Sequence, residues 1–136
     1  MRLYSLAAPA VLLMALLFCS YGDPLKAAPM AVEEFHRLYN AKQFDAIYDA
    51  SDSRFKKAVT KTQFIDLMND TFTKLGKIKD SKQTNFERET VGIDNIIRMY
   101  YKVAFENSDG TEVMTFVSEG GKVYLAHYSV DSPLLH

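Results

Sequence analysis

The sequence predicts an α+β fold, with N-terminal helices packed on one face of a curved, four-stranded antiparallel sheet. Two observations support this prediction. Hydrophobic residues recur at helical spacing between residues 31 and 75, whereas hydrophobic and polar residues tend to alternate between residues 78 and 130. The two patterns occupy separate parts of the chain and do not alternate with each other, which is the arrangement of an α+β protein.

The length and composition fit one globular domain. The 136 residues are 48% hydrophobic and 24% charged, enough to bury one core. The formal net charge of −1 lacks the basic excess of nucleic-acid-binding proteins, so no nucleic acid is expected as a partner. We predict a signal peptide at 1–22, a linker at 23–30, the α+β domain at 31–131 and a tail at 132–136.

The first 22 residues have the pattern of a secretory signal peptide. Arg2 precedes an apolar run from Leu6 to Phe18, and the small residues Ser20 and Gly22 favour cleavage before Asp23 or within the next few residues. We therefore expect an exported protein, periplasmic or secreted. An uncleaved membrane anchor is an alternative, although the apolar run is shorter than the roughly 20 residues that span a bilayer.

Cys19 is the only cysteine in the chain. A lipid on Cys19 is the second alternative to simple cleavage, but Phe18 is bulky where a bacterial lipobox has a small residue. The leader or this lipid is the only membrane attachment that we expect. Cleavage at the preferred site near Asp23 removes Cys19 and leaves a domain without disulfides or a cysteine nucleophile, so its stability has to come from core packing.

Three helical segments precede the strands. The first is expected to begin near Met30 or Ala31, after a proline-containing linker, and the second to run from Phe44 to Ala50. A short helical turn is expected around Phe55. The third helix has the clearest signals, with the capping-box pair Thr60 and Gln63 at its start, Phe64, Met68, Phe72 and Leu75 on one face, and Gly76 at its end. If Phe64, Met68 and Phe72 lay in water, the predicted architecture would be wrong.

Four strands follow. The run from 78 to 91 is weakly apolar, which predicts an edge strand with a well-solvated face. The run from 95 to 106 alternates, and the turn at 107–110 leads into an apolar return strand at 111–118 that we expect inside the sheet. A second turn at 119–122 leads to the last strand at 123–130. Alternation predicts one face with Tyr124, Ala126, Tyr128 and Val130, and the other with Val123, Leu125, His127 and Ser129.

Three short segments carry a family resemblance: Phe44 to Ser51, Phe55, and Leu75 to Lys79 leading into a strand. They resemble small exported bacterial domains of unknown function in the nuclear transport factor 2-like superfamily, which has a cone-shaped, cystatin-like α+β fold. The resemblance covers roughly residues 31–130 and implies a curved sheet around a long helix, with a cavity at the open end. Because this superfamily includes isomerases, dehydratases, ligand binders and structural dimer modules, the resemblance selects no function.

No residue set forms a catalytic motif, and the individual candidates have structural explanations. His127 on the last strand, Tyr100 and Asp45 are candidates for acid–base catalysis if they face a cavity. His36 lies beside the hydrophobic face of the first helix, without the spacing of a metal ligand set. We therefore predict neither a metal nor another cofactor.

Aromatic residues are the stronger signal for ligand binding. Tyr100 and Tyr101 are adjacent, so they must point to opposite faces of their strand. A buried phenol can donate a hydrogen bond to a ligand, although cross-strand packing is the ordinary role of such residues. The predicted ligand-binding residues are Tyr39, Tyr48, Tyr100, Tyr101, Phe116 and Tyr128.

The segment from Arg54 to Lys82 has eight basic and three acidic residues, a local net charge of +5. Anionic lipid or an acidic partner would suit such a segment, but a solvated helix surface is the ordinary explanation and the one that we favour.

We predict an exported, non-catalytic domain that binds a partner protein or a small apolar ligand through the curved sheet or the cone cavity. The alternative is a small-molecule enzyme of the isomerase, dehydratase or hydrolase type that uses a cavity acid, base and tyrosine. A third hypothesis is a homodimer formed through the open face of the sheet.

Overall fold

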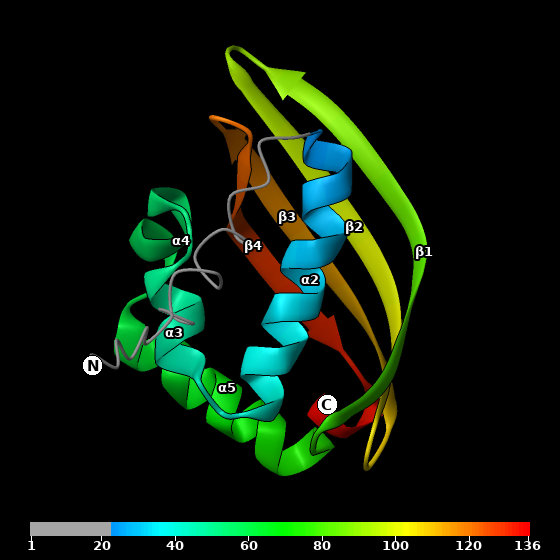
Figure 1. Ribbon diagram of the computed structural model, residues 1–136. Helices are drawn as coiled ribbons and strands as arrows, with labels where there is room; N and C mark the ends of the chain where they lie inside the picture. The colour runs from blue at the N-terminus through cyan, green and yellow to red at the C-terminus, as the bar shows by residue number, and fades with distance from the viewer. Residues whose placement is uncertain (1–22) are drawn as a thin grey trace, which may run out of the picture.

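The computed structural model describes residues 23–136, so the predictions for the leader and for Cys19 lie outside the described residues. The described chain confirms the predicted α+β class and the curved antiparallel sheet (Figure 1). Its elements, in order, are α2 (Pro24–Asn40), α3 (Phe44–Asp49), α4 (Ser53–Ala58), α5 (Lys61–Leu75), β1 (Ile78–Val91), β2 (Asp94–Phe105), β3 (Asp109–Glu119), β4 (Lys122–Asp131) and a short 3₁₀ helix, η1 (Pro133–Leu135).

Helix α2 begins six residues before Met30, so the segment predicted as a linker is helical. The Asp23 side chain caps the helix by accepting a hydrogen bond from the backbone N–H of Leu25 at 3.0 Å. Pro24 occupies the first turn, where a proline needs no intrahelical hydrogen bond. The helix continues through Pro29 at the loss of one such bond. The prolines had suggested a break, but the capped start and the buried Ala28 and Val32 favour the helix.

The sheet is a meander in the order β1-β2-β3-β4, with every neighbouring pair antiparallel. β1 is an edge strand as predicted, and most of its residues are exposed. Two register shifts against β2, one after Ile78 and one after Gln83, interrupt its pairing. Such bulges bend and twist a strand, which contributes to the curvature of this edge.

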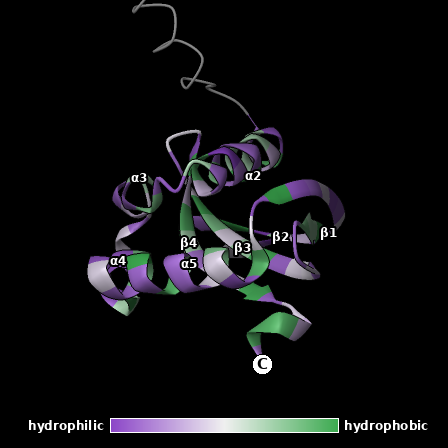
Figure 2. Cartoon of the chain, turned by 90° about the horizontal axis from the view of Figure 1, so that it is seen from below, coloured by the Kyte–Doolittle hydropathy of each residue, from purple (hydrophilic) through white to green (hydrophobic). Residues whose placement is uncertain are grey.

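Helix α2 lies along the concave face of the sheet, with α3 and α4 beside it and α5 crossing below (Figure 1). In the view from below, α5 crosses in front of the strands β3 and β4, and α2 is drawn above them (Figure 2). The residues that fill the centre come from both layers: Tyr39, Phe64, Met68, Leu75, Ile97, Met99 and Met114 are all buried. Phe72 is half-buried against this core. The third predicted helix therefore packs where the sequence placed it, and side chains occupy the centre of the cone.

The predicted capping box of α5 is present. The Thr60 hydroxyl accepts a hydrogen bond from the Gln63 backbone N–H, and the Gln63 side chain accepts one from the Thr60 backbone N–H. Gly76 ends the helix with a φ of 78°, in the left-handed region that favours glycine. These two signals set both ends of the helix.

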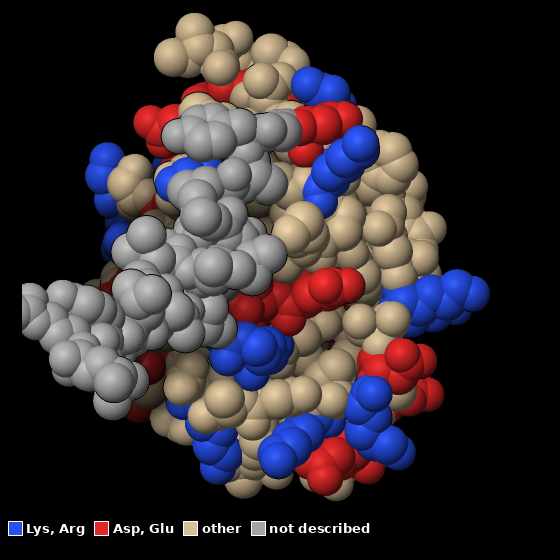
Figure 3. Space-filling view, viewed as in Figure 1, with Lys and Arg blue, Asp and Glu red and all other residues tan. Residues whose placement is uncertain are grey.

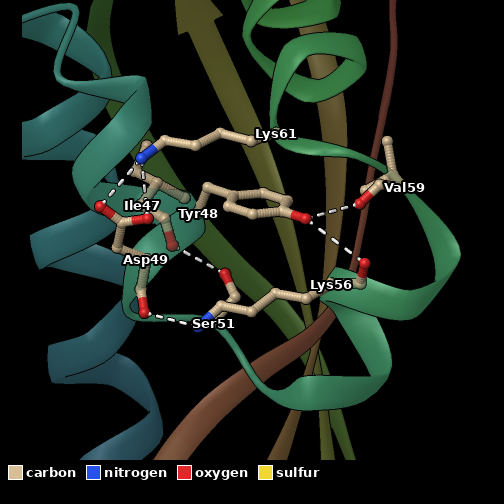
Figure 4. Close-up of polar contacts among 7 residues, drawn as sticks. All are labelled: Ile47, Tyr48, Asp49, Ser51, Lys56, Val59 and Lys61. Atoms are coloured by element: carbon tan, nitrogen blue, oxygen red, sulfur yellow. Dashed lines mark hydrogen bonds and ion pairs between the residues drawn. The ribbon is translucent and has the colours of Figure 1, made fainter.

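Tyr48 on α3 connects this helix to α4 and α5 (Figure 4). Its hydroxyl donates to the backbone carbonyls of Val59 at 2.9 Å and Lys56 at 3.3 Å, while its ring packs against Phe55 and Phe64. Lys61 at the start of α5 pairs with the Asp49 carboxylate at 2.9 Å. Tyr48 therefore holds α3 against α4 and α5.

Helix α5 offers a matched pair of neighbouring residues for testing this packing. Met68 is fully buried and Leu67 is 57% exposed. Met68→Ala should lower the free energy of unfolding by roughly 2–5 kcal/mol, because it leaves a cavity in the core. Leu67→Ala should change it by less than about 0.5 kcal/mol. Urea unfolding followed by circular dichroism measures both values, and equal losses would contradict the packing described here.

Candidate functional site

An apolar groove lies between helix α2, helix α3 and the start of strand β4, and we call it the α2–β4 groove. Its volume is about 710 Å³. Its hydrophobic lining comes from α2, α3, β3 and β4: Ala27, Met30, Ala31, Phe35, Leu38, Ile47, Ala50, Phe116, Val123, Tyr124 and Leu125. Pockets of roughly 300–1,000 Å³ with mainly hydrophobic walls are typical of small-molecule sites.

The groove forms because α2 turns two different sides toward its neighbours. Ala28, Val32 and Phe35 face the sheet and are buried. Met30 lies off this buried side, and 54% of its surface is exposed. The small residues Ala27 and Ala31 leave room between α2 and β4, which a larger side chain would fill.

Charged residues stand at the rim of the groove. On α2, Arg37 donates two hydrogen bonds to the Glu34 carboxylate, at 2.6 and 2.8 Å. These bonds lower the pKa of Glu34 below its ordinary value. On the other side, the exposed Lys122 follows the turn between β3 and β4. The groove thus combines an apolar floor with a polar edge.

A separate polar cluster is buried between α2 and the sheet. The Glu112 side chain from β3 is only 1% exposed. Its Oε1 atom lies 2.7 Å from Nε2 of His36, and its Oε2 atom accepts a hydrogen bond from the Tyr128 hydroxyl at 2.6 Å. Both carboxyl oxygens therefore have a partner, as a buried carboxyl group requires.

Aromatic rings surround this cluster. The Phe35 ring packs on Tyr128 with ring centroids 4.6 Å apart, and His36 meets the edge of Tyr101 at 6.1 Å. Burial, followed by the nearby Glu112, raises the pKa of Tyr128 well above its ordinary value. Burial likewise raises the pKa of Tyr101. Both carboxyl oxygens of Glu112 thus have partners inside the cluster. Phe35 contacts the cluster and also lines the groove.

The predicted ligand-binding residues do not form one site. Phe116 lines the groove. Tyr39 is buried in the core, where its hydroxyl donates to the Gly76 carbonyl at 2.9 Å, and Tyr48 binds backbone carbonyls as described above. Tyr101 and Tyr128 surround Glu112. Tyr100 points to the opposite face of the sheet and donates to Glu87 at 2.9 Å.

The three catalytic candidates lie apart from one another. His127 is exposed on the convex face, Tyr100 is half-buried on the same face, and Asp45 is exposed on α3. A register shift in β4 changes the predicted faces: Phe116 pairs with Leu125 and Thr115 with His127, which leaves Ala126 as the extra residue. Leu125 and Tyr128 therefore share the concave face, whereas simple alternation had placed Leu125 with His127.

Sequence reasoning missed Glu112, although the sequence contains a signal for it. In β3, Glu112 has the same parity as Met114 and Phe116, so period-two alternation places it on the buried face. A carboxyl group there needs partners, and one of them comes from α2, 76 positions earlier in the chain. No sequence spacing identifies such a contact. The groove residues Leu38, Ile47 and Tyr124 also had no separate signal, because they belong to ordinary hydrophobic patterns.

The basic segment from Arg54 to Lys82 does not form a single-sign surface. Arg54 pairs with Asp94 at 2.6 Å, Lys61 with Asp49 at 2.9 Å, and Lys74 with Asp70 at 3.0 Å. Figure 3 shows basic and acidic residues mixed over the described part of this face. Local ion pairs therefore offset part of the charge.

A second hollow, of about 530 Å³, lies on the convex side near the C-terminus. Charged groups of both signs surround it, among them Lys82, Lys102, Asp109 and Asp131. Its lining contains no aromatic residue and has fewer aliphatic residues (Val103, Ala104 and Pro133) than the lining of the α2–β4 groove. Within residues 23–136, no three His, Cys, Asp or Glu side chains gather as a metal site. No helix in this part of the chain has the length and apolar character needed to cross a membrane.

Comparison with known families gives one match. Residues 32–122 match the family model described as "Protein of unknown function (DUF3887)". No curated protein matches the chain in sequence. The matched region includes α3, α4, α5 and strands β1 to β3, so it covers most of the domain but names no activity. The resemblance to the wider nuclear transport factor 2-like superfamily stays a prediction.

Glu112 and His36 should be energetically coupled. The test uses a Tyr128→Phe background, so that removing Glu112 leaves no tyrosine hydroxyl without its acceptor. In this background, His36→Leu or Glu112→Leu should each lower the free energy of unfolding by roughly 3–5 kcal/mol, because the remaining polar residue stays buried without its partner. The double substitution should lower the free energy of unfolding by on the order of 1–3 kcal/mol less than the sum of the two single losses. Urea unfolding of the four proteins measures this coupling. His127→Leu, at an exposed site, is the control, and additive losses would show that the two groups act independently.

Stability should fall at alkaline pH because three phenols are buried. Burial raises the pKa of Tyr39, Tyr101 and Tyr128 in the folded protein. The pKa of a tyrosine in the unfolded chain is about 10. A tyrosine whose pKa is higher in the folded protein contributes to stability below about pH 10, and this contribution falls as the pH rises above that value. NMR titration of tyrosine ring carbons should show these three protonated at pH values near 10. Ionisation of any of them below that value in the folded protein would contradict their burial.

Proposed function

The chain belongs to the DUF3887 family, whose function is unknown, and we propose that it is an exported binding domain that holds the apolar part of a small ligand in the α2–β4 groove. The observation that carries this proposal is the groove itself, with its volume of about 710 Å³ and its mainly hydrophobic lining. Burial of apolar ligand surface there contributes roughly 25 cal/mol per Å² before the costs of binding. The signal-peptide pattern of residues 1–22 supports export.

The position of the groove also supports a small ligand. Its floor includes Phe116 and Leu125 from the sheet, and its walls include Leu38 and Ile47 from two helices. Two helices and two strands contribute residues to the groove, so a bound ligand can contact all four elements. A flat protein interface would instead need a broad surface, about 800 Å² on each partner.

The His36, Glu112 and Tyr128 cluster contains the groups that the alternative enzyme hypothesis required. None of the three residues lines the groove. Each carboxyl oxygen of Glu112 already has a protein partner, so the cluster resembles a structural connection between α2 and the sheet more than a site that awaits a substrate. We therefore favour binding over catalysis.

A groove-filling substitution tests the proposal. Ala27 lines the groove on α2, and Ala41 is exposed at the C-terminal end of the same helix. Ala27→Trp should weaken binding of the neutral apolar fluorophore N-phenylnaphthylamine by about tenfold or more, equivalent to roughly 1.4 kcal/mol, because the indole occupies the ligand's volume. Fluorescence titration measures the affinity.

Ala41→Trp is the matched control and should bind the fluorophore as the wild type does. Circular dichroism should show that both variants are folded. Absence of fluorophore binding to the wild-type protein, or equal binding by wild type and Ala27→Trp, would refute the groove as the ligand site.

A further inference from the structure

The charges at the rim of the α2–β4 groove are not equivalent. Arg37 is bound by Glu34 at 2.6 and 2.8 Å, so these two charges offset each other. Lys122 is exposed and forms no ion pair with any of residues 23–136, although Glu119 lies opposite it in the strand register. Lys122 is therefore the cation at the rim that is available to a ligand.

Glu33 is the remaining charged residue at the groove. The Glu33 carboxylate contributes to the raised pKa of Tyr101, after the larger effect of burial. Tyr101 belongs to β2 and packs against His36, on the β2 side of α2. β4, which carries Lys122, is separated from β2 by strand β3. Within residues 23–136, Glu33 forms no ion pair with Lys122.

We propose that the ligand of the groove is a long-chain carboxylic acid, with its alkyl chain along α2 and its carboxylate paired with Lys122. This inference rests on the proposed function and adds the chemical class of the ligand. The groove follows α2 from Ala27 to Leu38, which is about 16 Å at 1.5 Å per residue. An extended alkyl chain can therefore lie along the helix over this length.

The carboxylate determines the orientation of the acid. Lys122 and the two residues that follow it, Val123 and Tyr124, all line the groove, so the lysine lies beside apolar surface. A hydrogen bond between charged groups is about twice as strong as one between neutral groups. An alcohol of the same chain length keeps the hydrophobic contact and loses the charge interaction.

Displacement of N-phenylnaphthylamine from the purified protein tests this inference. Palmitate, hexadecanol and hexadecylamine have the same chain length and differ in the head group. Palmitate should displace the fluorophore at a concentration about tenfold lower than hexadecanol does, with hexadecylamine the weakest. Lys122→Gln should remove most of the preference for palmitate and leave displacement by hexadecanol unchanged.

Lys102→Gln, an exposed lysine on the convex face, is the matched control and should retain the preference for palmitate. Equal displacement by palmitate and hexadecanol, stronger displacement by hexadecylamine, or an unchanged preference in Lys122→Gln would overturn the assignment of a carboxylic acid. In those cases the groove would remain an apolar site. If the fluorophore does not bind at all, the proposed function fails and this inference fails with it.

Discussion

The buried carboxyl group of Glu112 is the contact that fixes helix α2 on the sheet. Hydrophobic surfaces pack without strong directional preference, so a helix on a concave sheet can shift or rotate at little cost. The pair formed by His36 and Glu112 removes this freedom, because a 2.7 Å contact exists in only one register of the helix. The hydrogen bond from Tyr128 to Glu112 fixes the other oxygen and ties β4 to the same point.

This contact also determines the shape of the groove. His36 and Phe35 are adjacent on α2, so a rotation of the helix that moved His36 would also move Phe35. That ring packs on Tyr128 and forms part of the groove wall. The core fills the centre of the cone, and the remaining space lies along the seam between α2 and β4. A ligand in this seam can bind without displacing a buried core residue.

The parts of the fold that depend on local interactions were predictable from the sequence. The ends of α5 follow from Thr60, Gln63 and Gly76, whose side chains or backbone act within one turn of the helix. The start of α2 was predicted too late, because Pro24 and Pro29 suggested a break and the cap by Asp23 was overlooked. The faces of β4 were predicted incorrectly because the bulge at Ala126 depends on pairing with β3, which no local pattern encodes.

The candidate site was less predictable for the same reason. Among the predicted ligand-binding residues only Phe116 lines the groove, since aromatic residues in a small domain are mostly recruited to the core. What makes the groove is the absence of bulk at Ala27, Ala31 and Ala50. A small residue on a helix has no distinctive sequence signal, and its effect appears only when the opposing element is known. A groove that forms where small residues leave space can therefore be found only from the tertiary structure. A charged residue at a buried position, such as Glu112, can be noticed in the sequence, because it interrupts the hydrophobic residues that alternate along one face of a strand.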